Sequence, residues 1–187
     1  MLIAQATKRN NIVEYILYLY QIEDIIRSFQ FKLGLIETTI ISKYDQPQEV
    51  KEQIKSWYEV LIAKMQNQRI EVKGHLSELH DLSAELQNLH QQLLTSYQNE
   101  KYIELYEAAK PSLKELVLKA AKENLQNEID VALHGMYGLL VLRLKKQAIG
   151  KETEEAMKKV STFLAYLAHY YKLMKEGKLE ISKNKQN

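Results

Sequence analysis

The sequence predicts an all-α fold, in which residues 1–187 form a single domain built as a bundle of five or six mostly antiparallel helices. Only six glycines and two prolines occur in the 187 residues, which leaves few turns and suits long helices better than a many-stranded sheet. Apolar residues recur at steps of three and four along most of the chain, which is the spacing of one helix face. Hydrophobic residues make up 45% of the chain, enough for a sizeable core.

The first predicted helix covers residues 11–30. Asn11 and Glu14 have the spacing of a capping box at its start. Its apolar face consists of Ile12, Tyr15, Ile16, Leu19, Ile22, Ile26 and Phe29. Residues 34–44 follow as a short helix, because their β-branched run at residues 38–41 has no second strand to pair with.

Asp45 and Pro47 restart a helix that we expect to reach residue 72, with Gly74 as the break after it. A leucine seam with heptad-like spacing comes next: Leu76, Leu79, Leu82, Leu86, Leu89 and Leu93. Helices of the same bundle would cover this seam, or a second chain would. We favour the internal cover, and a homodimer through this helix face or that of the last helix is the alternative.

Residues 99–110 are expected to form a short tyrosine-rich connector that ends at Pro111. Residues 112–115 have the pattern of a new capping box, at which the next helix begins. This helix is expected to reach about residue 148. Gly150 separates it from a last helix over residues 151–175, and residues 176–187 form a loose polar tail.

Composition places the chain in the cytoplasm. The absence of cysteine excludes disulfides and thiolate chemistry, and the first ten residues lack the apolar region of a signal peptide. The most apolar stretch, residues 129–144, is too short for a bilayer-spanning helix of about 20 residues, and it contains Asp130, His134 and Arg143. We therefore expect no membrane association.

Charge is unevenly distributed along the chain. Residues 1–140 contain 15 Lys and Arg against 19 Asp and Glu, whereas residues 141–187 contain 11 against 5. A basic C-terminal quarter is compatible with an acidic partner, but a solvated helix face with a frayed tail is the interpretation that we favour. The overall pI of about 8.5 is low for a nucleic-acid binder, so nucleic acid is not the expected ligand.

No catalytic motif is recognisable, and no cofactor is implied. The five histidines lack the spacing of three or four that places two metal ligands on one helix face, so no metal site is predicted, and His169 is expected to be exposed. Gly135 and Gly138 lie inside an apolar helical run. Each costs about 1 kcal/mol there relative to alanine. We expect close approach of another helix to offset that cost, and a notch for a ligand is the alternative.

Two charges fall on apolar helix faces. On the helical wheel of the first helix, Glu23 falls between Ile16 and Leu19, inside the apolar face. On a later helix, Arg143 shares an apolar face with Ile129, Met136 and Leu140. A buried charge is costly unless it is paired, so we expect a Glu23–Arg143 salt bridge, shared with Arg27 one turn after Glu23. Such a pair either fixes the packing of the helices or forms a polar site for a small anion. Glu23, Arg27 and Arg143 are therefore the candidate ligand-binding residues.

The chain resembles an uncharacterised all-helical Bacteroidetes family catalogued as a domain of unknown function. The resemblance rests on residues 12–18 (IVEYILY), 21–27 (QIEDIIR), 136–144 (MYGLLVLRL) and 175–180 (KEGKLE), and it covers essentially the whole length. It implies a cytoplasmic bacterial protein and brings no activity with it.

These observations lead to one functional hypothesis and two alternatives. The first is a non-enzymatic helical interaction or scaffold protein. The second is a nucleic-acid-associated regulatory protein that uses the basic C-terminal quarter. The third is an enzyme or small-molecule binder around Glu23, Arg27 and Arg143.

Overall fold

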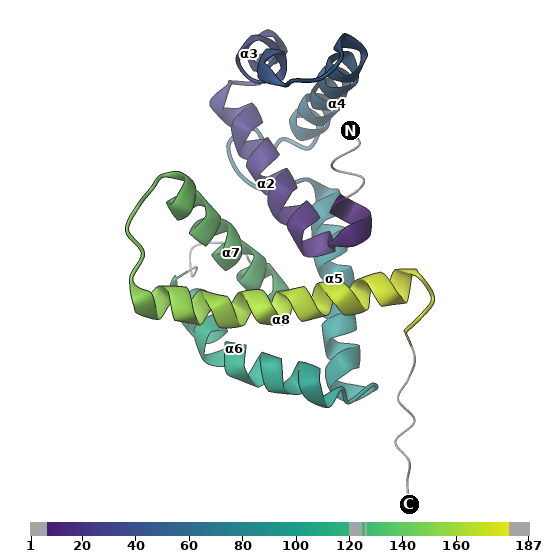
Figure 1. Cartoon of the computed structure of the whole chain (residues 1–187), viewed down its shortest axis with the longest axis vertical. Helices are drawn as coiled ribbons and strands as arrows, with labels where there is room; N and C mark the ends of the chain where they lie inside the picture. The colour runs from purple at the N-terminus through teal and green to yellow at the C-terminus, as the bar shows by residue number, and fades with distance from the viewer. Residues whose placement is uncertain (1–6, 120–124, 126, 180–187) are drawn as a thin grey trace, which may run out of the picture.

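The computed structural model describes residues 7–119, 125 and 127–179, and within these ranges it contains helices, turns and no strand. The predicted all-α class is therefore confirmed (Figure 1). A helical turn over residues 7–10 comes first. The elements that follow are α2 (Ile12–Ser28), α3 (Leu33–Thr39), the 3-10 helix η1 (Ile41–Lys43), α4 (Gln48–Asn67), α5 (Ser77–Thr95), α6 (Glu100–Lys119), α7 (Glu128–Leu144) and α8 (Lys151–Lys175).

These described elements are more numerous than the five or six helices expected. The short segment after α2 divides into α3 and η1, and residues 99–148 contain two helices instead of one. The start and end of α8 agree with the prediction, whereas α4 stops five residues early. Residues 180–187, most of the predicted polar tail, lie outside the described residues.

Asn11 begins α2 as predicted. Its side-chain oxygen accepts hydrogen bonds from the backbone N–H groups of Val13 at 3.1 Å and Glu14 at 3.2 Å. The Glu14 carboxylate binds the side-chain amide of Asn11 at 2.9 Å, not its backbone N–H as in a standard capping box. This cap fixes the angle at which residues 7–10 enter α2.

The predicted stop at Pro111 is wrong, because α6 runs through it from Glu100 to Lys119. Proline weakens a helix interior by removing one hydrogen bond and crowding the preceding turn. Burial outweighs that cost here. Tyr102, Tyr106, Ala109 and Leu113 are all buried, so one apolar face continues across the proline, which is itself exposed. The supposed tyrosine-rich connector is the first half of this face.

The leucine seam of α5 is buried inside the chain. All six leucines from Leu76 to Leu93 are at most 8% exposed, and α5 packs against α6, α7 and α8. The internal cover that we expected is thus present, and a homodimer stays a prediction. The preceding helix, α4, packs instead on α2, α3 and η1.

Helix α8 is the central element of the part of the fold that contains α5, α6 and α7. It contacts α2, α5, α6 and α7, and in Figure 1 it crosses α5 instead of running alongside it. The arrangement is therefore less regular than the antiparallel bundle expected. The buried face of α8, which is close to the predicted apolar stripe, consists of Met157, Val160, Phe163, Leu164, Leu167, Ala168 and Tyr171.

The two glycines of α7, Gly135 and Gly138, differ in their surroundings. A Cβ added to Gly135 would lie 2.6 Å from a side-chain carbon of Leu116 on α6, so close helix approach explains this glycine. Gly138 is exposed and has no such neighbour, so the same explanation is wrong for it. None of the described helices is both long enough and apolar enough to cross a membrane.

Candidate functional site

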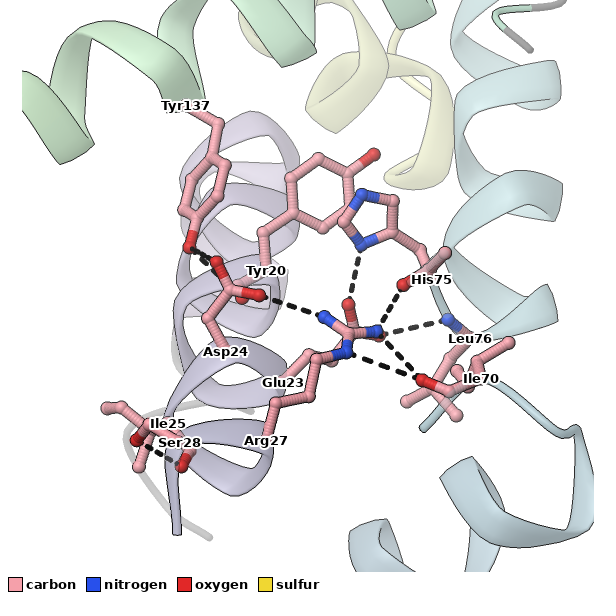
Figure 2. A network of polar contacts seen from close by, with 11 residues as sticks. Tyr20, Glu23, Asp24, Ile25, Arg27, Ser28, Ile70, His75, Leu76 and Tyr137 are labelled. Atoms are coloured by element: carbon pink, nitrogen blue, oxygen red, sulfur yellow. Dashed lines mark hydrogen bonds and ion pairs between the residues drawn. The ribbon is translucent and has the colours of Figure 1, made fainter. Parts of the chain in front are cut away.

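Glu23 is the most deeply buried carboxylate described, with 1% of its surface exposed. It projects from α2 toward the connection between α4 and α5 (Figure 2). One oxygen accepts a hydrogen bond from the backbone N–H of Leu76 at 2.9 Å, and the other lies 2.6 Å from Nδ1 of His75. Leu76 is the N-cap residue of α5, so the carboxylate also lies at the positive end of that helix.

His75 is held in one orientation by this contact. Nδ1 must carry a proton to donate to the carboxylate of Glu23, which defines the tautomer of the neutral ring. The ring stacks on Tyr20, with centroids 3.6 Å apart and an interplanar angle of 20°. Burial raises the pKa of Tyr20, and the carboxylates of Asp130 and Glu23 raise it further. Tyr20 therefore stays protonated at neutral pH.

Three histidines meet near this point although they are distant in sequence. The ring of His75 lies 5.3 Å from that of His134 and 6.4 Å from that of His80, measured between centroids. Within the described residues, no group of three or more His, Asp or Glu side chains is arranged to hold a metal ion.

Arg27 of α2 also binds the connection between α4 and α5. Its guanidinium donates to the carbonyl of Ile70 at 3.1 and 3.3 Å, to the carbonyl of Gly74, and to Asp24 at 2.9 Å. Gly74 has a φ of +94°, a conformation that favours glycine and that lets the chain turn into α5. Figure 2 shows these contacts converging on the connection.

Asp24 extends the network to α7. The hydroxyl of Tyr137 donates to its carboxylate at 2.6 Å. Burial raises the pKa of Tyr137, and its hydrogen bond to Asp24 adds to that shift. Helices α2 and α7 thus pack together as predicted.

The predicted Glu23–Arg143 salt bridge is wrong. Arg143 lies in the last turn of α7 and is exposed, and the partners of Glu23 are His75 and Leu76. Helix α7 is apolar on nearly all sides, so its sequence does not reveal which side faces the core. The sequence signal that was missed is His75, next to Gly74, the glycine at which the chain turns into α5.

A second polar cluster lies inside the bundle around the fully buried His90. Its Nδ1 lies 2.7 Å from the hydroxyl of Tyr102, and its Nε2 lies 3.7 Å from Glu128 without a hydrogen bond. Tyr106 donates to Glu128 at 2.8 Å. Burial lowers the pKa of His90, more than Glu128 raises it. The neutral ring therefore belongs to the core, packed against Phe163.

A surface hollow of about 460 Å³ lies where residues 7–10 meet the end of α8. Three buried residues form its floor, namely Ile12, Ala168 and Tyr171. Its rim consists of Lys8, Arg9, Asn10, Lys172, Lys175 and Glu176. Sequence reasoning missed this site, because the charge surplus of residues 141–187 gave no indication that Lys8 and Arg9 lie beside it.

The charges on this rim are only partly neutralised. Lys175 binds Glu85 at 2.6 Å, and Glu176 binds Lys178 at 2.8 Å. Lys8, Arg9 and Lys172 form no ion pair with any described residue. The pKa of Glu85 is lowered, first by its hydrogen bond to Lys175 and then by that to Tyr171. Three cations that form no ion pair with a described residue therefore surround a hollow with an apolar floor, although Lys8 also lies 5.3 Å from the centroid of the Tyr15 ring.

A comparison with known families matches residues 1–178 to a domain of unknown function, DUF4924. The chain belongs to this family. The match covers every element from α2 to α8 of the DUF4924 fold, together with the hollow. Comparison with curated proteins finds no match, and comparison with solved structures finds none either.

Proposed function

We propose that this DUF4924 protein is a non-enzymatic, cytoplasmic helical binding protein that captures an anionic ligand in the hollow between residues 7–10 and α8. The observation that carries the proposal is that Lys8, Arg9 and Lys172, none of which forms an ion pair with a described residue, surround one concave site. Like charges held close together repel one another, and an anion between them removes that repulsion.

The network around Glu23 supports a structural assignment for the residues first considered as ligand-binding. Both oxygens of Glu23 have partners, and Arg27 donates to three acceptors within the chain. These polar groups join α2, the α4–α5 connection and α7. An anion would have to displace existing hydrogen bonds there, whereas in the hollow it meets cations that form no ion pair with a described residue.

The test is an NMR titration of the ¹⁵N-labelled chain with inorganic phosphate at constant ionic strength. We expect amide shifts to concentrate at residues 8–12 and 168–176, and to vanish in Lys172→Glu. The matched control is Lys159→Glu, because Lys159 is an exposed lysine of the same helix outside the hollow. Absence of shifts in the unmodified chain, or equal loss in both variants, would contradict the proposal.

Nucleic acid is the competing ligand, since Lys172 and Lys175 belong to the basic C-terminal quarter. Its affinity would fall steeply with salt as counterions are released from the phosphates. Tight binding of a duplex at physiological salt that Lys172→Glu abolishes would replace the small anion with nucleic acid.

A further inference from the structure

The hollow has two chemically different parts, and both must be matched by whatever fills it. Its floor is formed by Ile12, Ala168 and the ring of Tyr171, which are 2%, 3% and 5% exposed. Each of them keeps only a small exposed patch, so the carbon surface at the bottom of the hollow is narrow. An inorganic anion at the rim would leave that surface uncovered.

The hydroxyl of Tyr171 is not available to a ligand. It donates to Glu85 at 2.8 Å, on the same oxygen that receives Lys175. Lys175 also lies 5.1 Å from the centroid of the Tyr171 ring, where a cation is attracted by the aromatic face. Lys175 thus covers part of the Tyr171 ring, Glu85 holds that ring in place, and the small part that stays exposed borders the hollow.

The charged groups stand at the edge of this floor. Lys8 and Arg9 enter from the turn before α2, and Lys172 enters from α8, so the cations flank the hollow from two elements. Arginine presents a planar fork that binds a carboxylate or phosphate through two hydrogen bonds, and lysine adds point charge. An anionic headgroup fits this rim.

The size of the hollow limits the rest of the ligand. Its 460 Å³ falls within the range of about 300–1,000 Å³ that is typical of small-molecule sites. We propose that the ligand is a small amphipathic anion, with a phosphate or carboxylate held by Lys8, Arg9 and Lys172 and an apolar body lying on Ile12, Ala168 and Tyr171. This inference rests on the proposed anion-binding function and names its ligand class.

The test compares three probes by isothermal titration calorimetry: 1-naphthyl phosphate, inorganic phosphate, and 1-naphthol. We expect 1-naphthyl phosphate to bind at least about tenfold more tightly than inorganic phosphate, because burial of its rings adds to binding at the rim. 1-Naphthol, which has the rings without the charge, should bind at least about tenfold more weakly as well.

Two variants separate the floor from the rim. Lys172→Glu should weaken 1-naphthyl phosphate at least about tenfold, and Lys159→Glu should leave it unchanged. Asn10→Trp places a bulky ring at an exposed position of the rim, so it should remove the preference for 1-naphthyl phosphate over inorganic phosphate. Circular dichroism confirms that each variant is folded.

The outcomes distinguish this inference from the proposed function. Equal affinity for inorganic phosphate and 1-naphthyl phosphate overturns the amphipathic ligand and keeps anion binding. Equal affinity for 1-naphthol and 1-naphthyl phosphate also overturns it. If none of the probes binds and no vesicle binding depends on Lys172, both proposals fail.

A second arm distinguishes a free molecule from a membrane lipid with the same chemistry. Co-sedimentation with vesicles that contain phosphatidic acid should show no binding that depends on Lys172. If the chain sediments with these vesicles through Lys172 and does not bind 1-naphthyl phosphate, the ligand is a lipid headgroup and the small soluble anion is excluded.

Discussion

Replacing Glu23 with alanine should destabilise the fold by about 3–5 kcal/mol, the usual cost of removing one partner from a buried charged contact. The magnitude follows from two contacts. The backbone N–H of Leu76, a fully buried residue, loses its acceptor, which costs about 1–3 kcal/mol. His75 loses a hydrogen bond to a charged group, worth about 1.5–3 kcal/mol.

Glu23→Gln should cost less, about 1–2 kcal/mol, because the amide oxygen still accepts from Leu76. The amide NH2 then faces Nδ1 of His75, and it can donate to that atom once the neutral ring takes its other tautomer. His75→Ala and the double variant Glu23→Ala/His75→Ala complete a thermodynamic cycle. The coupling energy should be about 1–3 kcal/mol, since the two side chains are in direct contact. Glu59→Gln is the control, because Glu59 is exposed and its change should stay within about 0.5 kcal/mol.

Urea denaturation followed by far-ultraviolet circular dichroism measures all five variants. Additive effects of Glu23→Ala and His75→Ala would refute the reasoning, because they would show that the contact contributes no coupling energy. A cost of Glu23→Ala no larger than that of Glu59→Gln would refute the buried location of the carboxylate as well.

Three further predictions follow from other parts of the structure. Arg143→Met should change the free energy of unfolding by less than about 0.5 kcal/mol, because Arg143 is exposed. Arg27→Met should cost about 2–4 kcal/mol, because its hydrogen bonds to Asp24 and to two backbone carbonyls are lost. Equal costs for the two variants in urea denaturation would contradict this. Gly138→Ala should stabilise α7 by up to about 1 kcal/mol, since no heavy atom beyond the neighbouring backbone of its own helix lies within 4 Å of the added carbon. Gly135→Ala should gain less stability, since its methyl group must displace the side chain of Leu116. Thermal unfolding that ranks the two variants in the opposite order would disprove the packing argument. Burial lowers the pKa of His90 from 6.5, so below about pH 6.5 the unfolded chain binds more protons than the folded one, and stability should fall as the pH falls. The variant His90→Gln should therefore lose less stability than the unmodified chain between about pH 7 and about pH 5.5. If the free energy of unfolding depends on pH equally in both, His90 is excluded as a contributor.

Local signals in the sequence were sufficient for most of the helices. The cap at Asn11, the break at Gly74 and the glycine before α8 are determined by neighbouring residues, and the structure has each of them. Pro111 shows where local reasoning fails. Its cost is local, but the burial of Tyr106 and Leu113 on either side depends on helices far away in the chain.

The candidate site was predictable only in part, for the same reason. The position of Glu23 on an apolar face correctly predicted a buried charge that needs a partner. Its partner could not be chosen, because the apolar surface of α7 hides its orientation and His75 lies in a connection without periodicity. The hollow joins Lys8 and Lys172 from opposite ends of the sequence, and no spacing rule relates them.

The place of α8 in the bundle also determines when the chain can fold during synthesis. Its contacts are with α2, α5, α6 and α7, all of which leave the ribosome before it does. Until residues 151–175 emerge, the apolar faces of those helices lack the part of their cover that α8 provides. A nascent chain with exposed apolar faces is prone to aggregate and is a substrate for chaperones. The bundle therefore closes late, and translation that stalls before α8 releases a chain that cannot complete its core.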